Sequence, residues 1–132
     1  KINKLNHVKS LWSGIGTCGT TPESLCYEAM MDNYLESVSG DDNYFINFSD
    51  GQPYFGNDEV RYVGSQAERH CKKQVKIMKN RGIKILSYFV ADYAYDREQQ
   101  SFKNMYGNDA SFIKPTNMME VAKTMNAMFL QK

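Results

Sequence analysis

The sequence contains little cysteine and no long apolar run, and each shortage excludes a class of protein. Its three cysteines, an odd number, occur without Cys-x-x-Cys spacing. This pattern excludes a disulfide scaffold or a zinc ribbon and favours a reducing, cytoplasmic setting. No apolar run approaches the roughly 18 residues that cross a bilayer, so we expect neither a membrane-spanning segment nor a membrane partner.

Basic side chains are missing from a long stretch of the chain. Residues 11–59 hold no lysine or arginine but nine aspartates and glutamates, whereas residues 69–84 hold seven basic residues and no acidic one. The acidic stretch would concentrate cations, which suits a hard divalent metal better than nucleic acid. The net charge of +1 also argues against nucleic acid as the main partner. A simpler interpretation is that both stretches are solvated helix faces.

Length and hydrophobic spacing indicate one α/β domain over residues 1–132. Apolar spacing predicts helices and strands in alternation. The expected helices cover residues 2–11, 22–38, 59–81, 96–106 and 118–129, and the expected strands cover residues 44–48, 83–91 and 110–114. Strands that alternate with helices predict parallel pairing in a three-layer sandwich with a mostly parallel sheet. Ligands of such sheets bind at the carboxyl ends of the strands.

Two short motifs fall at the ends of these elements. Thr20-Thr21-Pro22 follows a glycine-rich loop and begins a helix, where the Thr21 hydroxyl either caps the helix or reaches a bound cation. Ser49-Asp50-Gly51 follows the first expected strand, and the glycine lets the backbone turn away from the Asp50 carboxylate. Asp50 has a simpler interpretation as the aspartate of an Asp-Gly turn.

Together the two motifs resemble the von Willebrand factor A (VWA) domain. Gly-Thr-Thr-Pro before a helix, followed about thirty residues later by an apolar strand and Ser-Asp-Gly-x-Pro, is similar to the second and third parts of its metal-ion-dependent adhesion site. The sequence is most similar in kind to the VWA domains of cobaltochelatase-type subunits and of phage proteins like them. The resemblance implies a Rossmann-like topology.

The resemblance also implies a set of site residues. Thr21 and Asp50 would hold a Mg²⁺ ion, Asp50 through a water molecule. Four further residues would surround them or replace a ligand: Thr20, Ser49, Gly51 and Asp92. The first metal element of the family, Asp-x-Ser-x-Ser, is absent, and its nearest counterpart at residues 109–113 lacks the last serine. The chain thus resembles the carboxyl-terminal two-thirds of a VWA domain without the first strands, which predicts an exposed sheet edge at residues 44–48 and a dimer through it.

Three functions of different classes follow. In the first, the chain is a protein-binding module in which an Asp or Glu of the partner completes the coordination of Mg²⁺. In chelatase-like systems that partner is an AAA+ ATPase ring or a sister subunit. The second is a Mg²⁺-dependent enzyme subunit, such as a metal chelatase component or a phosphohydrolase, which requires a general base near the metal. The third is nucleic-acid binding by residues 69–84, a segment without interleaved aromatic residues.

Overall fold

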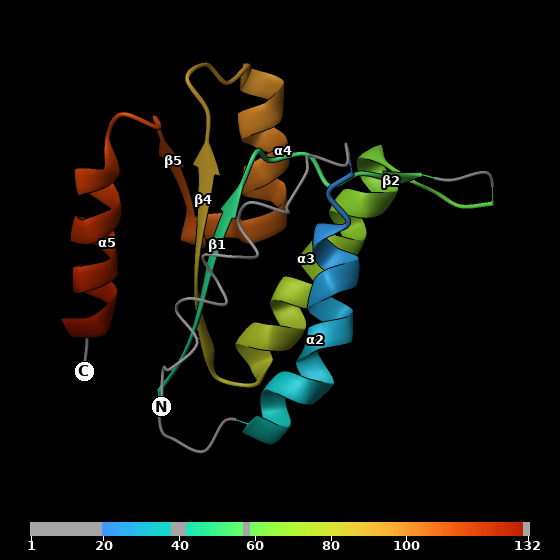
Figure 1. Cartoon of the computed structure of the whole chain (residues 1–132), viewed down its shortest axis with the longest axis horizontal. Helices are drawn as coiled ribbons and strands as arrows, with labels where there is room; N and C mark the ends of the chain where they lie inside the picture. Colours follow the sequence, from blue (N-terminus) through green and yellow to red (C-terminus); the bar gives the residue numbers. More distant parts are fainter. Residues whose placement is uncertain (1–19, 38–41, 57–58, 131–132) are drawn as a thin grey trace, which may run out of the picture.

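A computed structural model describes residues 20–37, 42–56 and 59–130 of the chain (Figure 1). The helix expected at residues 2–11 lies outside these ranges. In chain order the elements are α2 (Glu23–Ser37), β1 (Asn43–Ser49), β2 (Phe55–Gly56), β3 (Arg61–Tyr62), α3 (Gly64–Asn80), β4 (Ile83–Val90), α4 (Asp96–Tyr106), the 3₁₀ turn η1 (Gly107–Asp109), β5 (Ala110–Ile113) and α5 (Met118–Leu130).

The main sheet has three parallel strands in the order β1-β4-β5. Asn43 lies opposite Ile83 at one end of the β1–β4 pair, and Ser49 lies opposite Phe89 at the other end. The expected α/β class and the parallel pairing of the three strands are therefore confirmed. Within the described residues no further strand pairs with β1, which is the edge of this sheet.

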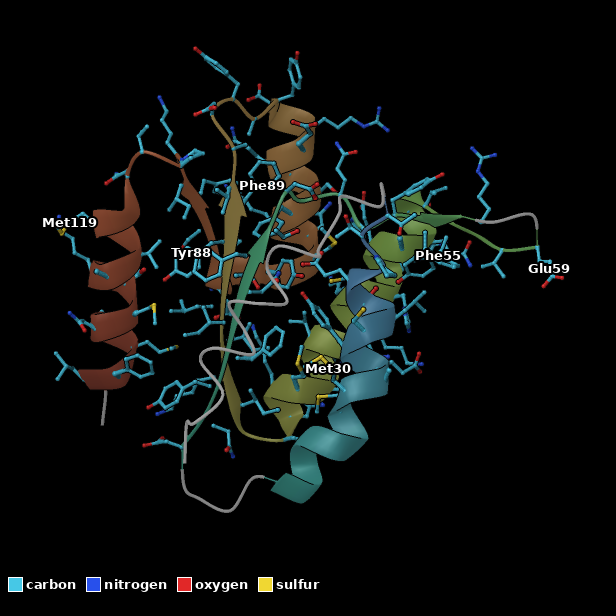
Figure 2. The ribbon with its side chains drawn as sticks, in the orientation of Figure 1. Met30, Phe55, Glu59, Tyr88, Phe89 and Met119 are labelled. Carbon is cyan, nitrogen blue, oxygen red and sulfur yellow. The ribbon has the colours of Figure 1, made fainter. Side chains whose placement is uncertain are left out.

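Helices flank the sheet, and alternate residues of the strands face different helices. The larger core contains buried residues of α2, α3, β4 and α4: Tyr27, Met31, Cys71, Val75, Met78, Ile83, Ile85, Phe89, Phe102, Met105 and Tyr106. A smaller core joins Tyr88 of β4 and Ile113 of β5 to Val121 of α5. Figure 2 shows the neighbours Tyr88 and Phe89 on opposite sides of β4, toward α5 and α4. None of the described helices combines the length and the apolar character that a bilayer crossing requires.

The start of α3 differs from the sequence-based expectation. The helix expected from residue 59 begins at Gly64, because residues 61–62 form β3 and pair antiparallel with β2. This small hairpin buries Tyr62 and leaves Val60 47% exposed. The apolar spacing of residues 60–63 suited a helix, and pairing with a distant segment overrode that local preference.

Candidate functional site

A two-residue backbone bridge joins the start of α2 to the turn after β1. The Thr21 N–H donates to the Tyr54 carbonyl at 2.7 Å, and the Tyr54 N–H donates to the Thr21 carbonyl at 2.9 Å. The same Thr21 carbonyl accepts the N–H of Glu23, the first residue of α2, at 2.8 Å. The two motifs found in the sequence therefore lie in segments that contact each other at the carboxyl end of β1.

The carboxylate of Glu23 is buried between α2 and β1. Its side chain is 6% exposed and accepts a hydrogen bond from the Tyr27 hydroxyl at 2.8 Å. It also accepts hydrogen bonds from the Asn47 side-chain amide and, at 3.3 Å, from the Ser49 hydroxyl. Tyr27 lies one helical turn after Glu23, and Asn47 and Ser49 share one face of the strand. Glu23 therefore ties the first turn of α2 to the end of β1.

Tyr106 of α4 and Cys71 of α3 extend this polar cluster. The Tyr106 hydroxyl oxygen lies 2.7 Å from that of Tyr27 and accepts hydrogen bonds from the Asn47 amide at 3.1 Å and the Cys71 thiol at 3.4 Å. Burial away from water raises the pKa of both tyrosine hydroxyls, and the charge of Glu23 raises them further. Burial also raises the pKa of the Cys71 thiol to about 12. All three groups are therefore neutral donors at neutral pH.

Gly51 brings the turn after β1 into contact with β4. Its φ angle is +87°, and a Cβ atom added there would lie 1.8 Å from a ring carbon of Phe89. The Gly51 N–H donates to the Ser49 hydroxyl at 3.0 Å, so the serine connects the turn to Glu23. Both the backbone angle and the contact require glycine at this position. The turn is thereby fixed against the end of the sheet.

The remaining residues expected at the site lie on the surface. Asp50 is exposed, and its Oδ1 accepts the Gln52 N–H at 3.4 Å, which is the hydrogen bond of an Asx turn. Thr20 is exposed, and so is Asp92, which follows β4. Within the described residues no hydrogen bond joins Asp92 to Thr21 or Asp50. The structure therefore brings together the Thr21 and Asp50 segments and does not link Asp92 to them.

The Thr21 hydroxyl and the Asp50 carboxylate offer oxygen atoms, which are the ligands that Mg²⁺ prefers in proteins. Thr21 is half-buried and Asp50 is exposed. In proteins, Mg²⁺ commonly binds one or two carboxylates and keeps several water ligands. Across residues 20–37, 42–56 and 59–130, no three His, Cys, Asp or Glu side chains gather into a metal-holding group. The donor chemistry thus fits Mg²⁺, while the number of protein ligands fits only a weak site.

A second chain of hydrogen bonds fixes the histidine of α3. His70 Nδ1 lies 2.7 Å from the Tyr62 hydroxyl oxygen, which also contacts the Ser24 hydroxyl. His70 Nε2 lies 3.2 Å from the Gln74 amide nitrogen and 3.4 Å from a carboxylate oxygen of Glu28. None of these partners belongs to the Asp50 turn. The histidine is therefore engaged in joining α2, β3 and α3 rather than in serving that turn as a base.

Sequence reasoning missed the buried carboxylate, although two signals could have found it. Glu23 and Tyr27 are spaced i, i+4, so they lie on one helix face, which the aromatic ring of Tyr27 marks as apolar. Asn47 interrupts an otherwise apolar strand of five residues. A polar residue inside a buried strand requires a hydrogen-bond partner, and an acidic side chain on the packed face of a helix requires donors.

The chain was compared with known protein families, curated proteins and solved structures, and none of them matches it. The fold itself defines an α/β domain with a three-stranded parallel sheet flanked by helices.

Proposed function

We propose that this chain is a protein-binding module of VWA type that uses Thr21 and Asp50 to hold a Mg²⁺ ion. The single observation that carries the proposal is the Thr21–Tyr54 bridge, which joins the Gly-Thr-Thr-Pro and Ser-Asp-Gly-x-Pro segments. In this proposal the domain is a three-layer sandwich of VWA topology, with α2, α3 and α4 on one side of the sheet and α5 on the other.

The position of the two proposed ligands outside the buried core supports a role in binding, because Asp50 is exposed and Thr21 is half-buried. An exposed Asp50 carboxylate and the Thr21 hydroxyl of the bridged segment would hold a metal while leaving coordination positions open to a partner. Bound Mg²⁺ would supply a positive charge that accepts a carboxylate oxygen of the partner. The chain's own contribution is positional, because the turn that carries Asp50 is fixed by Gly51 and Ser49. The partner would be a protein that presents an Asp or Glu, such as a subunit of an ATPase-associated assembly.

A capture experiment tests the proposal. The immobilised chain is exposed to extract of its source cells with Mg²⁺ or with EDTA. The Thr21→Ala and Asp50→Ala variants are compared with wild type. We expect a protein captured in Mg²⁺ to be lost in EDTA and with either variant. The Thr21–Tyr54 bridge uses backbone atoms, so Thr21→Ala removes the hydroxyl and keeps the bridge.

The triple variant Lys72→Glu, Lys73→Glu and Lys76→Glu is the matched control. These lysines are exposed on α3, so the change leaves the core intact and reverses the charge of the basic face. Capture unchanged in this variant and lost in the Asp50 variant supports the proposal. The opposite result, together with binding that falls steeply as salt rises, would assign function to nucleic acid at the basic face.

A further inference from the structure

The outer edge of β1 is open within the part of the chain that the structure describes. β4 pairs with the inner edge of β1 over all seven residues, from Asn43 to Ser49, and no described strand pairs with the outer edge. Figure 1 shows β1 at the border of the sheet, on the side away from β5. An edge strand presents a row of backbone N–H and C=O groups, so a further strand can add to the sheet at this border.

β1 lacks the features that usually protect such an edge. Its sequence, Asn-Tyr-Phe-Ile-Asn-Phe-Ser, contains no charged residue and no proline. Apolar side chains also lie exposed on both faces beside it. Phe48 stacks on Tyr88 on the side of α5 and is 51% exposed. Met30 of α2 lines a small recess together with Phe45 and is 49% exposed. A strand added here would therefore bury apolar surface as well as backbone groups.

The sequence of β1 is suited to pairing with a second copy of itself. A contact between identical surfaces has two-fold symmetry, and two identical strands that pair across an axis perpendicular to the sheet run antiparallel. The register that pairs all seven residues places this axis at Ile46, the central residue of β1. In that register Tyr44 of each copy lies opposite Phe48 of the other, an aromatic pair of the kind that stabilises antiparallel strands. Every residue of the strand thus lies opposite an uncharged one.

The same register brings two carboxylates together at each end of the paired strands. Asp42 precedes β1 and Asp50 follows it, so Asp42 of one copy lies opposite Asp50 of the other. Residues directly opposite in an antiparallel pair have Cα atoms roughly 4.5–5.5 Å apart and side chains on the same face. Like charges at such positions repel each other, so this pairing requires a cation between the two carboxylates.

Both aspartates have an oxygen available for that cation. Asp42 accepts the Lys84 ammonium at 2.7 Å with its Oδ1, and its Oδ2 forms no hydrogen bond with a residue that the structure describes. Asp50 uses only its Oδ1, for the long bond to the Gln52 N–H. Lys84 offsets one of the two negative charges and leaves the other. The remaining carboxylate oxygens are the ligands that Mg²⁺ prefers.

We propose that the chain forms a Mg²⁺-dependent dimer through the outer edges of its two β1 strands, in which Asp42 of each copy binds the Mg²⁺ ion held by Asp50 of the other. This inference deepens the proposed function and rests on it for the metal, because it names a second copy of the chain as the partner that supplies the carboxylate. The pairing of the strands rests on β1 alone.

Sedimentation velocity of the full chain in Mg²⁺ and in EDTA tests the inference. We expect dimers in Mg²⁺ and a dimerisation Kd at least about tenfold weaker in EDTA. Phe48→Lys places a charge at the edge and should weaken the dimer in Mg²⁺ by about tenfold or more. Met119→Lys is the matched control, because Met119 is 69% exposed at the start of α5 and lies away from β1 (Figure 2).

Asp42→Asn tests the metal bridge between the two copies. The substitution removes both the repulsion and a ligand, so dimerisation of this variant should no longer differ between Mg²⁺ and EDTA. Glu28→Gln is its control and should keep the wild-type difference, because the Glu28 carboxylate lies 3.4 Å from His70 of α3 and not at the edge of β1.

The outcomes separate this inference from the proposed function. A chain that binds Mg²⁺ but stays monomeric overturns the dimer and leaves the proposed function standing, whereas a chain that binds no Mg²⁺ contradicts both. Equal weakening by Phe48→Lys and Met119→Lys assigns the contact to another surface and overturns the dimer through β1. Dimers equally stable in Mg²⁺ and EDTA, or an unchanged Mg²⁺ dependence in Asp42→Asn, overturn the metal bridge.

Discussion

Two parts of the carboxyl end of β1 differ sharply in their surroundings. The inner part, built on Glu23, is buried and connected by hydrogen bonds to α2, β1 and, through Tyr106, to α4. The outer part, which includes Asp50 and Thr20, is exposed and has few hydrogen-bond partners among the residues that the structure describes. The inner residues therefore stabilise the turn, whereas the outer residues are available to bind another molecule. Substitutions should therefore affect stability in one part and binding in the other.

The largest loss of stability is expected for Glu23→Ala. The substitution leaves the buried donors of Tyr27, Asn47 and Ser49 without their acceptor, and we expect the free energy of unfolding to fall by about 3 kcal/mol. Chemical denaturation followed by circular dichroism measures the change. Glu28→Ala is the control on the same helix, since the Glu28 side chain is 60% exposed. Equal costs for the two variants would show that Glu23 does not hold the inner part together.

Gly51→Ala should destabilise the protein by about 2–3 kcal/mol. The new methyl group would meet the Phe89 ring, and the positive φ angle is unfavourable for alanine. Gly82→Ala is a matched control, because Gly82 also has a positive φ of +79° but nothing within 4 Å of an added Cβ. The control should cost about 1 kcal/mol. A Gly51 variant no less stable than the Gly82 variant would contradict the packing of the turn on β4.

Stability should fall as the pH rises above about 9. Cys71 keeps its proton in the folded chain to about pH 12, whereas in the unfolded chain it titrates near its ordinary pKa of 9.0. The unfolded state therefore loses the proton first, and each such group lowers the free energy of unfolding by up to about 1.4 kcal/mol per pH unit. The raised pKa values of Tyr27 and Tyr106 act in the same direction above pH 10. The free energy of unfolding, measured by chemical denaturation at several pH values between 8 and 10, should fall less steeply with pH for Cys71→Ala than for wild type. An unchanged pH dependence would contradict the assignment.

The sequence predicted most of the sheet, because its strands are short apolar runs bounded by turn residues. It also placed the ends of α4 correctly, since Gly107 ends the helix pattern. It failed at residues 55–62, where β2 pairs with β3 over a distance that local spacing does not report. At the carboxyl end of β1, the motifs of Thr21 and Asp50 predicted two segments that the structure joins through the Thr21–Tyr54 bridge, and their role as metal ligands stays a prediction. It missed Glu23, because the need for a buried carboxylate becomes visible only when α2 and β1 are packed together.

The smallest effect on stability is expected for Asp50→Ala. Asp50 is exposed and loses only the long hydrogen bond to the Gln52 N–H, so the free energy of unfolding should change by less than about 0.5 kcal/mol. The same denaturation assay measures it. A loss comparable with that of Glu23→Ala would abolish the distinction between the inner and outer parts.

A titration of the ¹⁵N-labelled chain with Mg²⁺, followed by NMR, tests the central claim most directly. The account predicts shifts at Thr21, Asp50 and Gly51 that saturate no more tightly than about millimolar, as expected for few protein ligands. The shifts should disappear in Asp50→Ala, while the amide signals of Glu23 and Tyr27 keep their folded positions. Shifts confined to other residues, or micromolar binding unaffected by Asp50→Ala, would contradict the assignment of the outer residues to a Mg²⁺ site.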